Sequence, residues 1–294
     1  MNLVESLIQR VRESQKRILI CGDAMVDRWV HGHSDICQDG CRKFVEESRI
    51  ESPGGAANAA RSLDNWEGVC VELFTYEKEY YPVKWRFVED GRIVFRWDEE
   101  LESDVLRQES NPIRTSYVLE IIEHSAGVLL SDYDKGFLTP EFITDIAERC
   151  KESDIPCVAD CKRAPEVYGG CILKGNAEYW KRHCDLMPGR IITCGHADPW
   201  ITGEDNISGK RPQVPCINHV GAGDCFAAHL VLALAYRFSL KEAAAIAHSA
   251  GRVYVQHPHN RPPQPHEIAA DMAGGVQDRS GLDIRIGCGP GAIP

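Results

Sequence analysis

A chain of 294 residues with 43% hydrophobic and 26% charged residues can bury a large core, as one domain or as a domain with a small appendage. The formal net charge of −11 is spread along the chain without a basic stripe, so nucleic acid is not an expected partner. No apolar run could span a bilayer, and residues 1–17 form a charged amphipathic pattern rather than a signal peptide, so we expect a cytoplasmic protein with no membrane partner.

Short apolar runs alternate with helical patterns along the rest of the chain. The runs predict strands at residues 17–23, 70–75, 127–132, 156–161, 170–176, 190–195 and 251–256. Helical patterns between them cover residues 54–66, 111–125, 139–153 and 223–236. This order predicts a three-layer α/β fold, in which helices cover both faces of a mostly parallel sheet.

Two segments, residues 44–53 and 83–99, instead alternate apolar and polar residues. In the second, Asp90-Gly91 lies where a hairpin turn would fall, between two arms rich in aromatic residues. The apolar face of this small antiparallel lid covers a ligand site or the same sheet of a second subunit, or it packs on its own domain. The predicted division is an α/β core at residues 1–43, 54–82 and 100–272, a lid at residues 44–53 and 83–99, and a glycine-rich segment at residues 273–294.

The 13 cysteines are scattered and mostly lie inside apolar patterns, which indicates reduced, buried thiols. Cys37 with Cys41 and Cys157 with Cys161 form C-x-x-x-C spacings, but neither pair has the C-x-x-C pairing or the histidines of a zinc site. We therefore expect no structural metal.

Polar or small residues stand at the ends of several predicted strands. In open parallel sheets, ligands bind at the carboxyl ends of the strands, so these residues mark the expected site. They are Gly22, Asp23, Ser131, Asp132, Asp160, Asn176, Thr193 and Gly195.

The stretch "HVGAGDCFAA" places two glycines and an acid before an almost wholly apolar run. The amides at a helix start bind anions, and Gly221 and Gly223 would let a phosphate come close to them. Asp224 would repel that phosphate as a ligand, but beside it the carboxylate can take the proton of an attacking hydroxyl. The alternative is that Asp224 only occupies a favourable position in the first turn of a helix.

A second glycine cluster, "SPGGAANAARSL", contains Gly54 and Gly55 before a small-residue helix that carries Asn58. The amide of Asn58 offers both a donor and an acceptor to sugar hydroxyls, whereas the small residues alone could serve helix packing. Asp23 and Asp27, after the first strand, could hold polyol hydroxyls or lie in a solvated loop.

Taken in this order, these elements resemble the ribokinase-like (PfkB) carbohydrate kinase family over roughly residues 17–270. The most specific motifs are "PGGAANAA" and "NHVGAGD", where the family has D-T-x-G-A-G-D. The resemblance implies a ribokinase-like fold, an anion hole at Gly221, Ala222 and Gly223, and Asp224 as the catalytic base. It also implies ATP and Mg²⁺ as cofactors.

Within that family, "GDAMVDRWVHG", "FRWDEE" and "LLSDYDKGFLT" are most similar to the kinase branch that phosphorylates heptose 7-phosphate at the anomeric position. The candidate substrate contacts are Asp23, Asp27, Gly54, Gly55, Asn58, Arg96, Asp132 and Lys162. Arg96 and Lys162 are the two suited to a substrate phosphate. The candidate nucleotide contacts are Asn176, Thr193, Gly195 and His248.

The chain also departs from that branch. "KEYYP" replaces a longer segment before the lid hairpin, "ICQDGCRKF" replaces the substrate loop, and the family's N-x-x-E reads "NAEY". We therefore expect an ATP-dependent kinase of a sugar or sugar phosphate, which could form a homodimer through the lid hairpin. The alternatives are a family kinase for another sugar or a nucleoside, or a catalytically weak relative that binds a sugar phosphate or nucleotide.

Overall fold

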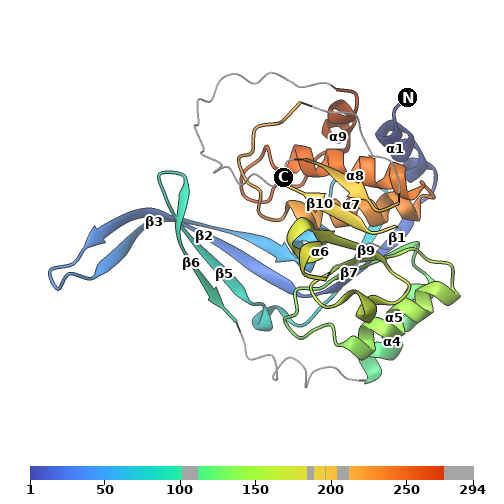
Figure 1. Cartoon of the computed structure of the whole chain (residues 1–294), viewed down its shortest axis with the longest axis horizontal. Helices are drawn as coiled ribbons and strands as arrows, with labels where there is room; N and C mark the ends of the chain where they lie inside the picture. Colours follow the sequence, from blue (N-terminus) through green and yellow to red (C-terminus); the bar gives the residue numbers. More distant parts are fainter. Residues whose placement is uncertain (101–111, 184–188, 196, 204–211, 275–294) are drawn as a thin grey trace.

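The computed structural model describes residues 1–100, 112–183, 189–195, 197–203 and 212–274, which form a layered body and a projecting lid (Figure 1). Most of the glycine-rich segment predicted at residues 273–294 lies outside the described residues. The main sheet has seven strands, in the spatial order β11 (Ala197–Ile201), β10 (Ile191–Cys194), β9 (Ile172–Asn176), β8 (Cys157–Asp160), β7 (Gly127–Ser131), β1 (Lys16–Gly22) and β4 (Val69–Phe74).

All neighbouring strands of this sheet pair in parallel except β10 and β11, which are antiparallel. Helices cover both faces (Figure 1). One face carries α1 (Leu3–Glu13), α2 (Ala56–Arg61), α7 (Ala222–Ala235), α8 (Leu240–Tyr254) and α9 (Pro265–Met272), and the other carries α4 (Pro112–Glu123), α5 (Pro140–Glu152) and α6 (Ala177–His183). The predicted three-layer α/β fold is confirmed.

The continuous apolar runs arise because each central strand is buried on both faces. In β1, Ile18 and Ile20 pack into the cluster under α7 and α8, whereas Leu19 and Cys21 pack into the cluster under α4 and α5. Successive side chains of a strand point to opposite faces, so no position of such a strand is free to be polar until the strand ends.

The most apolar helix, α7, is buried from Asp224 to Ala235 and holds its own first turn at the sheet edge. Alternating small and large residues let it pack between the sheet and α8. Among the helices that the structure describes, none is long and apolar enough to cross a membrane.

The strand predicted at residues 251–256 is wrong, because residues 251–254 form the end of α8 and the next two residues form a turn. Ser239 and Glu242 make a capping box that starts this helix. Gly251 in this helix lies near the first turn of α7, where an added Cβ would make only an ordinary contact, 4.0 Å from the backbone oxygen of Ala222. The sequence reading also missed β11, whose Pro199 is tolerated because the strand lies at the edge of the sheet.

The lid is a separate four-stranded sheet in the order β3 (Arg42–Gly55), β2 (Ala24–Ile36), β5 (Val83–Glu89) and β6 (Arg92–Glu99). The predicted hairpin is confirmed, because β5 and β6 pair antiparallel around Asp90-Gly91. The lid is larger than predicted: β2, which the sequence reading placed in the core, pairs with β3 and, in parallel, with β5. A short 3₁₀ turn, η1 (Lys78–Tyr80), leads from the main sheet into β5.

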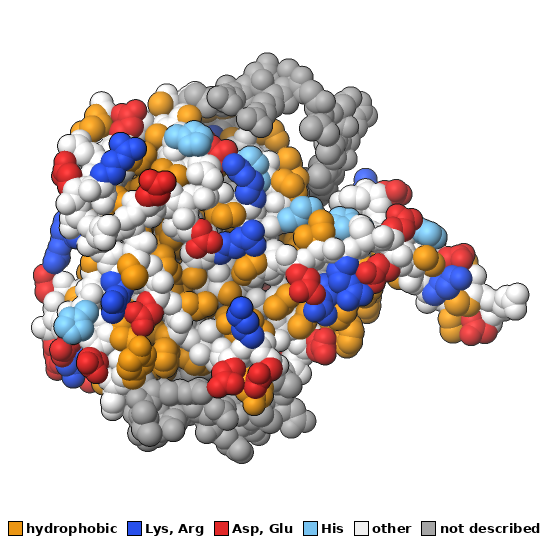
Figure 2. Space-filling view, turned by 180° about the vertical axis from the view of Figure 1, so that it is seen from behind, with side chains coloured by type: hydrophobic (Ala, Val, Ile, Leu, Met, Phe, Trp, Pro, Cys, Tyr) orange, Lys and Arg blue, Asp and Glu red, His pale blue; other side chains and the backbone are white. Residues whose placement is uncertain are grey.

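The two faces of the lid differ in character. On the outer face, Trp85 stacks on Trp97 with ring centroids 5.5 Å apart, and Phe87 contacts Phe95 at 5.6 Å. Trp97 remains 49% exposed and Phe95 62% exposed. The space-filling view shows the lid projecting from the body, with acidic and basic side chains interspersed along it (Figure 2). The inner face, described below, is charged and turned towards the body.

Candidate active site

Polar residues that follow three neighbouring strands meet at one edge of the main sheet. Gly22 at the end of β1 pairs with Ser131 at the end of β7, and Ser131 pairs with Asp160 at the end of β8. Asp23 and Asp132, the residues after β1 and β7, are fully buried. The edge that the sequence marks is therefore where the carboxylates gather.

Helix α7 begins at the same edge. Its N-cap, Gly221, has the left-handed φ of +83°, which suits glycine. A Cβ at this position would lie 2.3 Å from Nδ2 of Asn58 and 2.4 Å from the hydroxyl of Tyr254. The first turn, Ala222, Gly223 and Asp224, is thereby brought against α2, and a helix start of this kind presents amides to an anion.

Two donors from different elements bond the carboxylate of Asp224. Asn58 in α2 donates from Nδ2 to Oδ2 at 2.9 Å, and the hydroxyl of Tyr133, which follows β7, donates to Oδ1 at 2.6 Å. Nδ2 of Asn58 also lies 3.2 Å from the carbonyl oxygen of Gly221, and Tyr254 donates to Oδ1 of Asn58 at 3.3 Å. These bonds fix the carboxylate relative to the helix start.

Burial raises the pKa of Asp224 to about 6, although the hydrogen bonds from Tyr133 and Asn58 oppose this rise. Only 3% of the residue is exposed. A carboxyl group with this pKa is ionised at neutral pH and is a stronger base than an ordinary aspartate. Its position and basicity both suit proton abstraction from a hydroxyl.

A buried lysine lies beneath the first turn of α7. Nζ of Lys174 in β9 donates to Oδ2 of Asp160 at 2.7 Å and to the carbonyl oxygen of Gly223 at 3.3 Å. A Cβ at Gly223 would lie 3.0 Å from this nitrogen. Lys174 therefore ties the helix start to the end of β8.

The lid contributes a second set of polar contacts. Oδ1 of Asp27 in β2 accepts a bond from Nη2 of Arg86 in β5 at 2.8 Å, and both side chains are buried. Nδ2 of Asn260 reaches Oδ2 of Asp27 at 3.4 Å, and its Oδ1 accepts a bond from Asn218 at 3.0 Å. Asn218 also accepts a bond from the amide of Val220 at 3.0 Å. A chain of contacts thus joins the lid to the loop before α7.

Both glycines of the second cluster pack closely against the candidate acids. A Cβ at Gly54 would lie 2.8 Å from Oδ2 of Asp27, and one at Gly55 would lie 2.3 Å from the backbone oxygen of Asp23. The glycines therefore serve the close approach of β3 to β2 and to the end of β1.

Two lysines converge on the ring of Tyr133. Nζ of Lys84, on the inner face of the lid, and Nζ of Lys162, after β8, each lie 4.9 Å from the ring centroid. Within the described part of the chain, neither ammonium group has an ion-pair partner. Arg96, in contrast, donates to both oxygens of Asp98, at 2.6 and 2.5 Å.

Asp23 and Asp132 both hold the loop that carries Tyr133. The carboxylate of Asp23 accepts bonds from the amides of residues 133, 135 and 137, at 2.8, 3.2 and 3.1 Å. Asp132 accepts bonds from Arg163 and from the hydroxyl of Tyr168, the latter at 2.5 Å. The structure thus gives these two acids partners within the protein, where the sequence predicts substrate contacts.

The four candidate nucleotide residues lie on different elements of the fold. Asn176 accepts a bond from the amide of Tyr179 at 2.8 Å at the start of α6, and Thr193 reaches the carbonyl oxygen of Gly175 at 3.4 Å. Gly195 follows β10 with a φ of +61°, and His248 is buried in α8. Part of the intervening chain, residues 204–211, lies outside the described residues.

Curated relatives share sequence with most of the chain. A Bifunctional protein HldE from Hyphomonas neptunium is 28% identical over 94% of the chain and 68% of its own length. Another from Nitratiruptor sp. is 27% identical over 81% of the chain and 61% of its own length. The chain thus spans about two thirds of these relatives. No protein-family model matches it.

Solved structures share its architecture. A putative ribokinase from Agrobacterium tumefaciens superposes with a TM-score of 0.65 and 17% identity, covering 88% of this chain and 98% of that one. The chain has the ribokinase-like fold. Arabidopsis thaliana ribokinase complexed with ribose and ATP gives a TM-score of 0.63 at 14% identity, covering 88% of this chain and 99% of that one. Escherichia coli phosphofructokinase-2 in complex with substrates and products gives a TM-score of 0.65 at 16% identity, covering 88% of this chain and 98% of that one. The resemblance to ribokinase-like carbohydrate kinases is confirmed.

The ribokinase-like site contains few ligands for a resident metal. No group of three or more His, Cys, Asp or Glu among the described residues could hold an ion. Mg²⁺ in phosphoryl transfer is bound by phosphate oxygens and only one or two carboxylates, so this donor set fits an ion that enters with ATP. Asp160, the last residue of β8, and Asn176, the last residue of β9, are two oxygen-bearing side chains at this edge that would hold such an ion.

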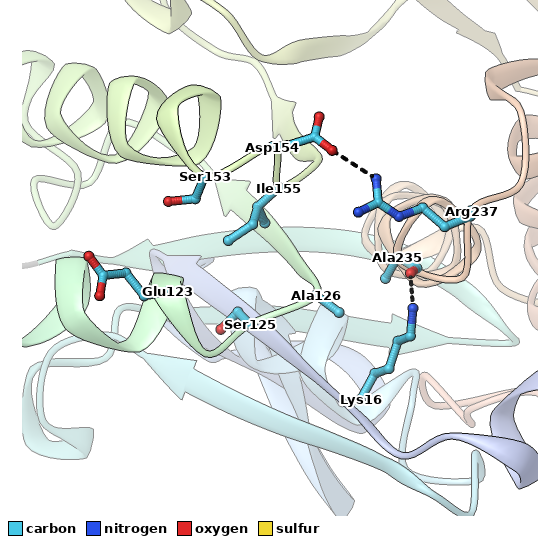
Figure 3. A pocket seen from close by; sticks show the side chains of 9 residues that line it. All are labelled: Lys16, Glu123, Ser125, Ala126, Ser153, Asp154, Ile155, Ala235 and Arg237. Atoms are coloured by element: carbon cyan, nitrogen blue, oxygen red, sulfur yellow. Dashed lines mark hydrogen bonds and ion pairs between the residues drawn. The ribbon is translucent and has the colours of Figure 1, made fainter.

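A separate pocket of about 340 Å³ lies at the other end of the ribokinase-like sheet (Figure 3). Lys16 at the start of β1, Ser125 before β7 and Ile155 before β8 line it. In Figure 3 the side chain of Lys16 points to the carbonyl oxygen of Ala235, with a distance of 2.6 Å. Because ligands of such sheets bind at the carboxyl ends of the strands, this pocket is not the candidate active site.

Sequence reasoning missed several residues of the site. It did not single out Lys84, Tyr133, Lys174 or Asn260, and it weighed Lys162 rather than Arg163, which pairs with Asp132. Tyr133 lies in the quoted "LLSDYDKGFLT" motif, directly after a predicted strand, so its position could have marked it. The link from Asn260 to Asp27 spans 233 residues, and no local pattern signals it.

Proposed function

We propose that this chain is an ATP-dependent carbohydrate kinase in which Asp224 is the base and the amides of the first turn of α7 are the anion hole. The buried carboxylate of Asp224 at this helix start, fixed by Asn58 and Tyr133, is the observation that carries the proposal. The acceptor hydroxyl would give its proton to Asp224 as its oxygen attacks the γ-phosphorus, and ADP would leave. The amides would stabilise the charge that develops on the transferred group.

The nucleotide would bind beside the same helix start. Asn176, Thr193, Gly195 and His248 are the proposed contacts, with Mg²⁺ neutralising the phosphates. The proposal is supported by the carboxyl ends of β9 and β10, which lie at this edge, and by the ribose and ATP named for the Arabidopsis ribokinase of the same fold.

The acceptor would lie between the inner face of the lid and the first turn of α7. Asp27, Gly54, Gly55 and Asn58 are the proposed sugar contacts on the side of β2, β3 and α2. Heptose 7-phosphate is the proposed acceptor, phosphorylated at its anomeric hydroxyl, because "GDAMVDRWVHG", "FRWDEE" and "LLSDYDKGFLT" resemble the heptose 7-phosphate kinase branch.

Lys84 and Lys162 are the proposed ligands of the acceptor phosphate. Both ammonium groups face Tyr133 without an ion-pair partner in the described part of the chain, whereas Arg96 is already held by Asp98. Asp23, Asp132 and Arg96 would then support the site through the contacts that they make within the protein.

An acceptor screen tests the proposal. ADP release would be measured with heptose 7-phosphate, ribose, fructose and adenosine, each with ATP and Mg²⁺. The expected result is turnover that is fastest with heptose 7-phosphate. Faster turnover of a neutral sugar or a nucleoside would reassign the acceptor, and binding of the sugar phosphate or of ATP without turnover of any acceptor would favour the catalytically weak relative.

We further propose that the chain forms a homodimer joined through the hairpin of the lid, in the cytoplasm that the sequence leads us to expect. Its outer face carries the stacked Trp85 and Trp97 together with Phe95, which is largely exposed. Covering such a face with the same face of a second copy would remove apolar surface from water.

A further inference from the structure

Tyr133 contacts both the candidate base and two cations of the site. Its hydroxyl lies 2.6 Å from Oδ1 of Asp224, and its ring lies 4.9 Å from the ammonium groups of Lys84 and Lys162. The proposed reaction uses Tyr133 only as a hydrogen-bond partner of the base, and nothing else that the structure describes bonds Oδ1 of Asp224 so closely.

The backbone holds Tyr133 in this place. Its amide donates to Oδ2 of Asp23 at 2.8 Å, and the amides of Lys135 and Phe137 bond the same carboxylate. Since Asp23 is fully buried beside the end of β1, the loop is anchored to the sheet on both sides of residue 134. The phenol therefore projects from a fixed loop rather than from a mobile one.

The charges around the phenol decide the direction of the hydrogen bond. Burial, followed by the nearby charge of Asp224, raises the pKa of Tyr133 well above its ordinary value. The phenol is therefore protonated at neutral pH and donates, and the carboxylate accepts. A donor aimed at a carboxylate favours its ionised form.

Asn58 and Tyr133 act together on the carboxylate. One donates to Oδ2 and the other to Oδ1, so they hold both oxygens from two sides. Each carboxylate oxygen has a second lone pair, which remains able to accept the proton of an acceptor hydroxyl. The carboxylate of Asp224 can therefore act as a base while the phenol of Tyr133 remains hydrogen-bonded to it.

We propose that Tyr133 is a positioning residue for the base: its hydroxyl holds the carboxylate of Asp224 in the orientation for proton abstraction and does not itself transfer a proton. This inference rests on the proposed function, because it takes Asp224 as the base. The acceptor proton ends on Asp224, and the O–H bond of Tyr133 is not broken.

Tyr133→Phe tests the inference without any need for turnover. Carboxyl carbons of ¹³C-aspartate-labelled protein would be titrated by NMR, and the Asp224 resonance would be assigned by its loss in Asp224→Asn. Removing a donor to the ionised form should raise the pKa of Asp224 by about one unit. The matched control is Tyr236→Phe, which removes a phenol that bonds the carbonyl oxygen of Ser14 at 2.7 Å, remote from the site. An Asp224 pKa that is equal in the two variants would overturn the inference.

The kinetic constants of Tyr133→Phe distinguish two roles of the phenol: positioning the carboxylate of Asp224, or merely occupying the place where the acceptor binds. A positioning role predicts that Tyr133→Phe lowers kcat about tenfold, leaves KM for the acceptor nearly unchanged, and moves the acid limb of kcat/KM to higher pH. A lower KM with unchanged or higher kcat would mean that the phenol only occupies the place of the acceptor, and would contradict the inference. If the wild-type chain turns over no acceptor, the proposed function fails, while the NMR titration still decides the role of Tyr133.

Discussion

Replacing Gly221 by alanine perturbs the contact between the start of α7 and Asn58. At a φ of +83°, alanine costs about 1–2 kcal/mol of stability relative to glycine. The added Cβ would also lie 2.3 Å from Nδ2 of Asn58 and 2.4 Å from the hydroxyl of Tyr254, closer than real Cβ contacts. Asn58 must therefore shift, which weakens its bonds to Asp224 and to the carbonyl oxygen of Gly221.

The expected effect falls mainly on turnover. A hydrogen bond to a charged group contributes about 2 kcal/mol. Losing that amount in the transition state lowers kcat about 30-fold. The assay is ADP release, with thermal unfolding measured in parallel. Gly274→Ala is the matched control, because Gly274 has a φ of +80° but has nothing within 4 Å of an added Cβ. A kcat for Gly221→Ala within about threefold of the control would refute the role given to this contact.

Three further changes have defined outcomes. Because the pKa of Asp224 is raised to about 6, its ionisation costs stability as the pH rises towards that value. Asp224→Asn should therefore gain about 2 kcal/mol relative to wild type between pH 4 and pH 8 in urea unfolding, and an unchanged difference would contradict its burial. Lys84→Met should raise KM for a phosphorylated acceptor at least tenfold. The control Lys241→Met, on the exposed start of α8, should leave KM unchanged. Equal KM values in the two variants would show that Lys84 does not bind the acceptor phosphate. Trp97→Ser should convert a dimer into monomers in analytical ultracentrifugation, and a dimer that survives would place its interface elsewhere.

The sequence predicts the main sheet well, because most of its strands are buried on both faces and leave continuous apolar runs. Ile18 to Cys21 is such a run, and the acids that follow it mark the edge where the site lies. The prediction of secondary structure fails where a neighbouring helix start determines the conformation of residues whose own sequence suggests a strand. Val253, Tyr254 and Val255 suggest a strand at residues 251–256, yet the capping box at Ser239 starts a helix that continues to Tyr254.

The prediction of the site is limited by long-range contacts. Gly221, Asp224 and Asn58 stand in motifs, so the sequence marks them, and the structure brings them into hydrogen-bond contact. Lys84 and Asn260 stand in ordinary-looking segments and reach the site only through the pairing of β2 with β5 and the packing of the residues after α8. The partners of Asp23 lie in the loop after β7, and Arg163 and Tyr168, the side-chain partners of Asp132, lie after β8; no local pattern reveals either set.

The central claim is that Asp224 is the base, and Asp224→Asn tests it most directly. Asparagine keeps the size of the side chain and cannot accept the proton, so kcat for ADP release should fall about a thousandfold. Binding of a non-hydrolysable ATP analogue and of the acceptor, measured by calorimetry, should stay close to wild type. Turnover that is unchanged in Asp224→Asn would contradict the claim.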